Sequence, residues 1–88
     1  MKLKVFWKND CPHCPDAKKL AQALEEMLEV QYLSVDSVDG LSEACMFNIM
    51  STPSLVIVDK SDQEIESWRG VVPGFDEIKN KVLDSEEN

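Results

Sequence analysis

The sequence predicts a single α/β domain in which a four-stranded mixed sheet is flanked by three helices. Three patterns support this prediction. An alternating strand pattern at 2–7 leads into a stretch with helical periodicity. Four consecutive apolar residues at 55–58 indicate a strand covered on both faces. A polar turn at 60–63 then predicts a hairpin. With 88 residues, the chain has room for one domain with a modest core.

The first half of the chain predicts a strand, a helix and a second strand. Residues 2–7 alternate Leu3, Val5 and Trp7 against Lys2, Lys4 and Phe6. A helix is expected from Cys11, because apolar residues follow at helical spacing as far as Leu28. Residues 30–35 have the β-branched and aromatic content of a strand. Together these elements predict a right-handed parallel crossover.

The second half predicts a helix, two strands and a last helix. Ser37 or Asp39 can cap a helix over 41–47, and Asn48 suits the left-handed position that ends it. Strands are expected at 54–59 and 64–69, giving the element order strand–helix–strand–helix–strand–strand–helix. We expect the strand order 2-1-3-4, with the fourth strand antiparallel to the rest. The last helix follows Pro73-Gly74, buries Phe75, Ile78 and Val82, and frays over 85–88.

Charge and hydropathy exclude several classes of partner. The chain has 9 Lys and Arg against 17 Asp and Glu, a formal net charge of −8, which argues against nucleic acid and anionic membranes. No stretch is long and apolar enough to span a bilayer, and the first apolar run is too short for a signal peptide. We therefore expect a cytoplasmic protein, and a monomer.

The central motif is a C-x-x-C formed by Cys11 and Cys14, between the first strand and its helix. Unpaired N–H groups and the dipole at a helix start stabilise a thiolate, lowering a cysteine pKa from about 8.5 to roughly 3.5–7.5. Pro12 suits the first helical position, and His13 adds positive charge when it is protonated. Pro15 conflicts with a regular first turn, because a residue before proline disfavours helical geometry.

Three other interpretations of the motif compete with redox chemistry. A structural disulfide closing so short a loop stabilises by only about 2 kcal/mol. A zinc site needs four ligands, and the chain has no second C-x-x-C. A chance C-x-x-C on a binding module is the third. We favour a redox pair, with no metal and no organic cofactor. The third cysteine, Cys45, is expected to be a small buried hydrophobe.

A second motif, Thr52-Pro53, stands directly before the most apolar strand. A proline entering a buried strand fits as its first residue, and a cis X–Pro bond is a recurrent solution at such corners. We expect a cis bond within van der Waals reach of the cysteine pair, with a plain trans proline as the alternative.

These motifs, in this order, resemble the thioredoxin superfamily. Trp7 stands four residues before the C-x-x-C, Thr52-Pro53 precedes the apolar strand, and Trp68-Arg69-Gly70 precedes the last helix. The match covers nearly the whole chain but lacks the extra first strand and helix of full thioredoxins. In that respect the chain is similar to glutaredoxins and short glutaredoxin-like thioredoxins.

The resemblance implies a thioredoxin fold and assigns roles to the site residues. Cys11 would be the nucleophile and Cys14 the resolving thiol. Thr52-Pro53 would form a cis corner whose backbone pairs with a substrate peptide. Gly70 would let the substrate chain approach closely. For Trp7, a place flanking the site and a place in the core are about equally supported, whereas Trp68 is expected in the core.

The chain also departs from its relatives at several positions. Val5 stands where thioredoxins carry a buried aspartate, and Pro12-His13 replaces Gly-Pro, as in strongly oxidising periplasmic enzymes. Lys8 matches a glutaredoxin lysine. If His13 holds Cys11 as a thiolate, the potential should rise by roughly 30–60 mV above a thioredoxin-like −270 mV.

The function expected from these features is thiol–disulfide exchange with disulfide-containing protein substrates, served by a separate reductase. The Gly-Gly and acid that hold glutathione in glutaredoxins are not present in order, which argues against glutathione. The alternatives are a glutathione-dependent glutaredoxin and a redox-inert adaptor of the same fold.

Overall fold

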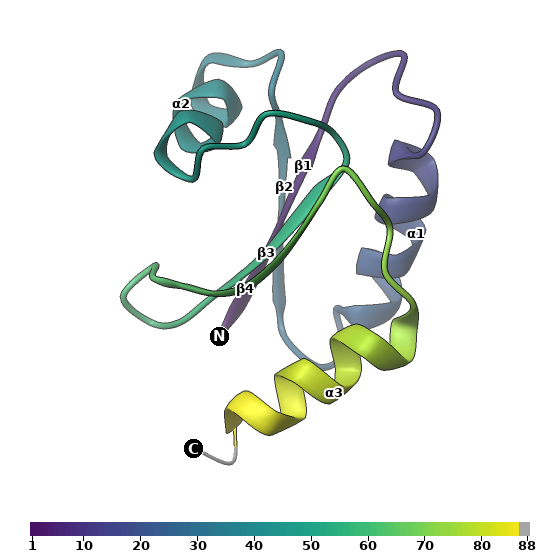
Figure 1. The fold of residues 1–88 in the computed structure, drawn as a ribbon, viewed down its shortest axis with the longest axis vertical. Helices are drawn as coiled ribbons and strands as arrows, with labels where there is room; N and C mark the ends of the chain where they lie inside the picture. Colours follow the sequence, from purple (N-terminus) through teal and green to yellow (C-terminus); the bar gives the residue numbers. More distant parts are fainter. Residues whose placement is uncertain (87–88) are drawn as a thin grey trace.

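The computed structural model describes residues 1–86 and shows the expected order of elements (Figure 1). They are β1 (Lys2–Trp7), α1 (Cys14–Leu24), β2 (Glu29–Ser34), α2 (Val38–Met46), β3 (Ser54–Val58), β4 (Glu64–Arg69) and α3 (Phe75–Glu86). None of the helices in this described part is long and apolar enough to cross a membrane.

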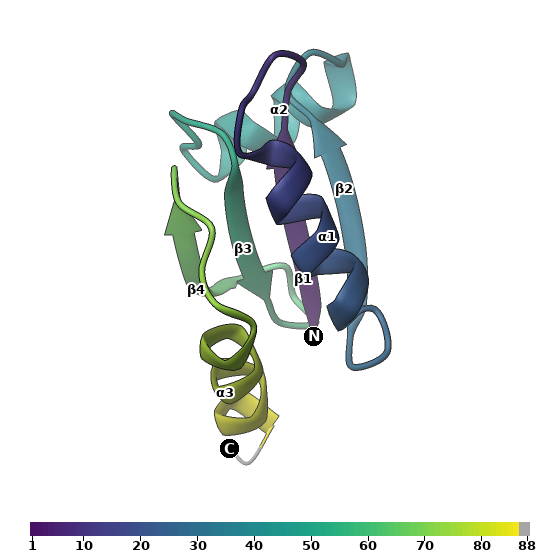
Figure 2. The ribbon, with the colours of Figure 1, turned by 90° about the vertical axis from the view of Figure 1, so that its right-hand side faces the viewer.

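The four strands form one sheet in the order β2-β1-β3-β4, which confirms the predicted order. β1 and β2 are parallel, with Val5 beside Tyr32, whereas β3 is antiparallel to both β1 and β4. The expectation that the fourth strand alone reverses is therefore wrong, because β4 runs parallel to β1 and β3 is the reversed strand. The reason is the position of α2, which lies near the carboxyl ends of β1 and β2 (Figures 1 and 2). Because α2 does not carry the chain back to the amino ends of these strands, β3 starts at their carboxyl ends and runs in the opposite direction.

Helices cover both faces of the sheet, with α1 and α3 on one side and α2 on the other (Figure 2). Alternation along β1 divides its side chains between two buried clusters. Leu3 and Val5 pack with α1 and α3, whereas Phe6 packs with α2. Every residue of β3 is buried, which confirms the strand covered on both faces.

The start of α1 differs from the prediction. The helix begins at Cys14 rather than Cys11, with His13 as its N-cap residue and Pro15 in its first turn. The Cys14 amide donates to the Cys11 carbonyl at 3.3 Å, so the C-x-x-C is a turn that leads into the helix. Pro15 is tolerated there because the first helical turn needs no N–H from it, whereas Pro12 lies in the preceding turn.

The last two helices also shift at their ends. α2 begins at Val38, and the Ser37 hydroxyl caps it by accepting the Gly40 amide at 3.0 Å. Asn48 has the expected left-handed φ of 57°. Phe75 is 39% exposed rather than buried, because it opens α3 one turn outside the stretch packed by Ile78. α3 extends to residue 86, and the expected fraying over 85–88 stays a prediction, because residues 87–88 lie outside the described part.

Candidate active site

The two cysteines of the C-x-x-C are joined by a disulfide at the junction of β1 and α1, with their Cα atoms 5.4 Å apart. Cys11 is 8% exposed and Cys14 is 2% exposed. Cys11 is therefore the more exposed residue of the pair and Cys14 the more buried one, which is the order of exposure that the sequence predicts.

The helix start that bears on the charge of the cysteine pair comes later in the chain than expected. α1 begins at Cys14, three residues after Cys11, where the Cys14 amide donates to the Cys11 carbonyl and Pro15 has no N–H. His13 is exposed in the turn and makes no capping hydrogen bond through its side chain. Asp16, in the first helical turn, is exposed beside it. The turn thus presents one imidazole and one carboxylate to solvent next to the disulfide.

The Thr52–Pro53 peptide bond is cis, and Pro53 is buried. The Gly70 amide donates to the Pro53 carbonyl at 2.9 Å. Gly70 has a left-handed φ of 74°, and a Cβ there would lie 2.9 Å from the Ser51 hydroxyl oxygen. The left-handed backbone conformation therefore favours glycine beside the corner, whereas the Ser51 hydroxyl, at the tip of an exposed side chain, could rotate away from a Cβ.

An arginine that the sequence reasoning missed holds the segment before this corner. The Arg69 guanidinium donates to the carbonyls of Phe47 at 2.9 Å and Asn48 at 3.4 Å, and pairs with Glu64 at 2.7 Å. Carbonyls at a helix end lack intrahelical partners, so a cation there is favourable. Arg69 and Gly70 consequently fix the two ends of segment 47–53.

The two tryptophans play different parts. The Trp7 ring is half-buried, and the Lys18 ammonium lies 3.4 Å from its centroid, a cation–π contact that occupies one ring face. The sequence reasoning missed this contact. Trp68 packs against the core, as expected, and its indole N–H donates to Glu77 of α3.

The third cysteine is not buried as expected. Cys45 is an exposed free thiol, because α2 turns only Gly40 and Ala44 fully towards the sheet.

Two hollows flank the corner. The first, of about 340 Å³, lies between the C-x-x-C turn and the loop before α3 and is lined by His13, Asp16, Gly70, Val71 and Val72. The second, of about 200 Å³, lies between the end of β1, α2 and segment 49–52 and is lined by Lys8, Val35, Leu41, Ala44, Ile49, Met50, Ser51 and Thr52.

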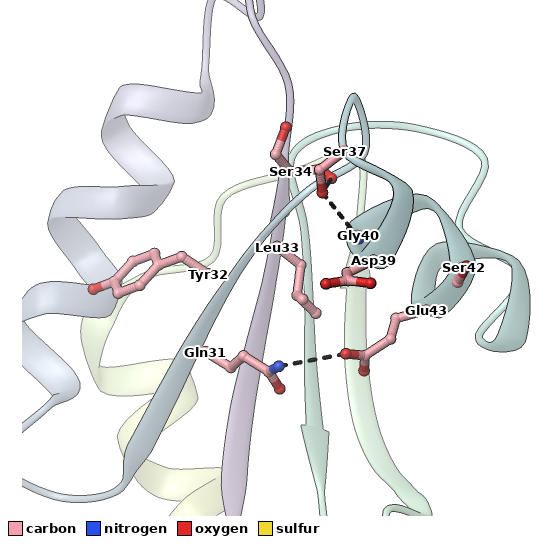
Figure 3. A pocket seen from close by; sticks show the side chains of 9 residues that line it. All are labelled: Gln31, Tyr32, Leu33, Ser34, Ser37, Asp39, Gly40, Ser42 and Glu43. Carbon is pink, nitrogen blue, oxygen red and sulfur yellow. Dashed lines mark hydrogen bonds between the residues drawn. The ribbon is translucent and has the colours of Figure 1, made fainter.

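A larger hollow of about 540 Å³ lies between β2 and α2 and contains none of the predicted site residues (Figure 3). The Gln31 amide donates to the Glu43 carboxylate across it at 3.3 Å (Figure 3). Glu43 also accepts from Lys4, which ties α2 to β1. This hollow is part of the structural contact between α2 and the sheet. Among residues 1–86, no three His, Cys, Asp or Glu side chains are grouped to hold a metal ion.

Known proteins similar to this chain are thioredoxins. The chain is 42% identical over 60 residues to the "Probable Thioredoxin" of Archaeoglobus fulgidus, an alignment covering 66% of each protein. It is 33% identical over 61 residues to the thioredoxin of Methanocaldococcus jannaschii, covering 65% of this chain and 69% of that one. The aligned part thus spans about two thirds of these curated relatives.

Solved structures show the same fold. Thioredoxin 1 of Thermosipho africanus superposes with a TM-score of 0.72 at 20% identity, covering 99% of this chain and 96% of that one. A mutant thioredoxin of Halobacterium salinarum gives 0.80 at 20% identity, covering 94% of this chain and 72% of that one. The family model described as a thioredoxin domain matches residues 1–83, from the first strand into the last helix. The chain therefore belongs to the thioredoxin family of thiol–disulfide oxidoreductases, and its redox pair is Cys11–Cys14.

Proposed function

We propose that this protein reduces or exchanges disulfides in protein substrates, with Cys11 attacking and Cys14 resolving. The observation that carries the proposal is the difference in exposure between the two cysteines, 8% for Cys11 and 2% for Cys14. A substrate disulfide reaches the outer sulfur first, whereas the inner sulfur is protected until an intramolecular step needs it.

The chemistry balances as a two-electron exchange. The reduced Cys11 thiolate attacks one sulfur of the substrate disulfide, whose S–S bond breaks and releases one substrate thiol after protonation. The mixed disulfide that remains is attacked by the Cys14 thiolate at the Cys11 sulfur. The second substrate thiol leaves, and the protein is left with the Cys11–Cys14 disulfide. A separate two-electron reductase regenerates the dithiol.

The corner gives a substrate strand a place to pair. Thr52 lies outside β3, and neither its N–H nor its carbonyl makes a backbone hydrogen bond within residues 1–86. Unpaired backbone groups beside a sheet are what strand addition uses. Gly70, which has no side chain, borders the corner on the other side. These features support Thr52, Pro53 and Gly70 as substrate-binding residues.

The remaining residues are proposed in supporting roles. His13 borders the 340 Å³ hollow and would add positive charge near the attacking thiolate. Trp7 would support the site through its packing, with the Lys18 ammonium over one face of its ring. Pro12 would restrict the turn that carries Cys11. Three properties stay predictions from the sequence: a monomeric state, a cytoplasmic location, and an electron donor other than glutathione.

The test is disulfide reduction in insulin, with dithiothreitol as the electron source. The wild-type protein should accelerate the reaction, Cys11→Ser and Cys14→Ser should abolish it, and Cys45→Ser should leave it unchanged. A second arm replaces dithiothreitol with glutathione, glutathione reductase and NADPH. Activity in that arm would identify a glutaredoxin, and silence in both arms would leave an adaptor that only binds.

A further inference from the structure

The two edges of the sheet differ in how their own side chains cover them. β2 and β4 are the edge strands, since the strand order is β2-β1-β3-β4. On β4, the Glu66 carboxylate accepts the Ser67 amide at 3.1 Å, and Lys81 of α3 pairs with Glu66 at 3.3 Å. Charged side chains on an edge strand protect it from pairing with another chain. The edge of β4 is therefore covered.

The edge of β2 is open at Val30 and Tyr32. The Val35 amide donates to the Trp7 carbonyl at 2.9 Å, so every second residue back from Val35 turns its backbone groups towards β1. Val30 and Tyr32 consequently turn their N–H and C=O groups away from β1. Within residues 1–86, no strand and no side chain bonds these outward groups. The two residues offer two donors and two acceptors to an added strand.

We propose that the open edge of β2 binds an extended basic segment of a partner protein, which adds to the sheet as a further strand. Main-chain hydrogen bonds to Val30 and Tyr32 hold the segment, and its alternate side chains contact the two faces of the sheet. The proposal is independent of the exchange reaction, because neither Cys11 nor Cys14 lies on β2 or α2.

On one face, the added strand meets the 540 Å³ hollow between β2 and α2 (Figure 3). Gln31 and Glu43 join β2 to α2 along one wall of this hollow. The Asp39 carboxylate lies on the other wall, is exposed, and makes no hydrogen bond or ion pair with another residue of the described part (Figure 3). A lysine or arginine of the added strand therefore has a free carboxylate within the hollow to pair with.

On the other face, the added strand meets the ring of Tyr32. Val30 packs against the core cluster that includes α1, and Tyr32, two positions later, shares its face and points away from the hollow (Figure 3). Burial and then the charge of Glu25 raise the pKa of the Tyr32 phenol, so a second carboxylate lies beside this ring. Tyr32 is 36% exposed, which leaves ring surface for a β-branched side chain of the added strand.

Charge determines which occupant fits this edge. Glu25, Asp39 and Glu29, which begins β2, place carboxylates around it. The nearest cations are already opposed, since Lys4 is buried and paired inside and Lys2 lies beside Glu29 in the β1–β2 register. A second copy of this chain would bring the same carboxylates to the edge and be repelled, whereas a basic segment is attracted. The predicted occupant therefore alternates basic and β-branched residues.

The experiment uses a fluorescein-labelled octapeptide in which lysine and threonine alternate. The matched control peptide has the same composition with all its lysines first. Both carry the same charge, but only the alternating peptide places basic and β-branched side chains on opposite faces of a strand. Fluorescence anisotropy with the full-length protein at physiological ionic strength measures each dissociation constant. The alternating peptide should bind about tenfold more tightly, which corresponds to about 1.4 kcal/mol.

Hydrogen exchange, measured by NMR, locates the bound strand. With the alternating peptide at saturation, the Val30 and Tyr32 amides should exchange about tenfold more slowly, because both gain partners. The Ser67 amide, on the covered edge, should keep its exchange rate. Insulin reduction should also keep its rate, because the edge contains neither redox cysteine.

Matched variants separate the backbone contact from the charge contact. Tyr32→Pro removes the outward N–H but not the ladder to β1, and an edge strand tolerates proline at such a position. It should weaken binding by about tenfold, whereas Tyr32→Thr, which keeps the N–H, should weaken it by less than about threefold. Asp39→Asn should weaken binding by about fivefold. Asp76→Asn, which removes one charge at the start of α3, should change it by less than about twofold.

Equal affinity of the two peptides would overturn strand addition, and slowed exchange at Thr52 in place of Val30 and Tyr32 would assign the peptide to the corner instead. Slow exchange at Val30 and Tyr32 without peptide, increasing with protein concentration, would make a second copy the occupant. No binding of either peptide would overturn this proposal alone, whereas failure of insulin reduction without peptide would overturn only the proposed function.

Discussion

Replacing Gly40 by alanine should be among the most damaging small substitutions in this chain. Gly40 lies in α2 and is buried against β2. A Cβ built on it would lie 1.8 Å from the Ser34 carbonyl oxygen and 2.5 Å from the Ser34 carbonyl carbon. These are backbone atoms of a paired strand, so α2 has to move. That movement would disturb the Ser37 cap, whose hydroxyl bonds both Ser34 and Gly40.

The magnitude follows from three opposing contributions. Overpacking costs about 1–3 kcal/mol, and a backbone contact this close belongs at the upper end. Loss of a serine cap costs about 1 kcal/mol more. Alanine gains about 1 kcal/mol over glycine in helix propensity. The net loss in free energy of unfolding is therefore about 3 kcal/mol, or roughly 12–24 °C in Tm for a domain of this size.

Urea unfolding followed by circular dichroism measures this loss, and Gly74→Ala is the matched control. A Cβ at Gly74 meets no atom within 4 Å, so that variant should be unchanged or more stable by about 0.4–1 kcal/mol. A loss below about 1 kcal/mol for Gly40→Ala would refute the close approach of α2 to β2.

Three further predictions test the charges. Lys4 is 4% exposed and lies 2.5 Å from the Glu43 carboxylate, whose side chain is 25% exposed. Glu43→Gln leaves the Lys4 ammonium without its charge partner, so it should lower the free energy of unfolding in urea by about 2 kcal/mol. A Lys4→Met, Glu43→Leu double variant should recover most of that loss. The pKa of Glu66 is lowered, first by the backbone amide of the next residue and then by Lys81. Ionised Glu66 therefore stabilises the folded protein above its unfolded pKa, and this stabilisation disappears as the pH falls through its folded pKa. Because Lys81 is not the largest cause, an NMR titration of Lys81→Gln should show the folded pKa of Glu66 raised only slightly. His13→Ala should lower the reduction potential by roughly 30–60 mV, and an unchanged potential would make His13 only a spacer.

The sequence predicts those parts of the fold that depend on local pattern. The apolar run at 55–58 identifies β3 because a strand with no polar alternation has to be covered on both faces. Asn48 is recognisable as a helix end because few other residues accept its left-handed backbone. The C-x-x-C at a strand–helix junction likewise requires only sequence spacing.

Other features depend on which of two residues takes the same position in a helix, or on contacts between residues that are distant in the sequence. The sequence favours Pro12 for the first helical turn and makes Pro15 a conflict, and only the folded chain shows Pro15 in that turn. The contacts of Arg69 with Phe47 and Asn48 join residues 22 and 21 positions apart, so no local pattern reveals them. The exposure of Cys45 depends on which side of α2 faces the sheet, and the short pattern of that helix does not determine it.

The most direct test of the account is to trap the mixed disulfide and identify the cysteine that forms it. Cys11→Ser and Cys14→Ser are each made in a Cys45→Ser background, because the exposed Cys45 thiol would otherwise form adducts of its own. Each reduced protein is mixed with a disulfide-containing protein substrate, and the products are separated without reductant and identified by mass spectrometry. The Cys14→Ser protein should accumulate a stable adduct through Cys11, and the Cys11→Ser protein should not. An adduct through Cys14 instead would contradict the assigned order of attack, and no adduct from either variant would contradict the exchange mechanism itself.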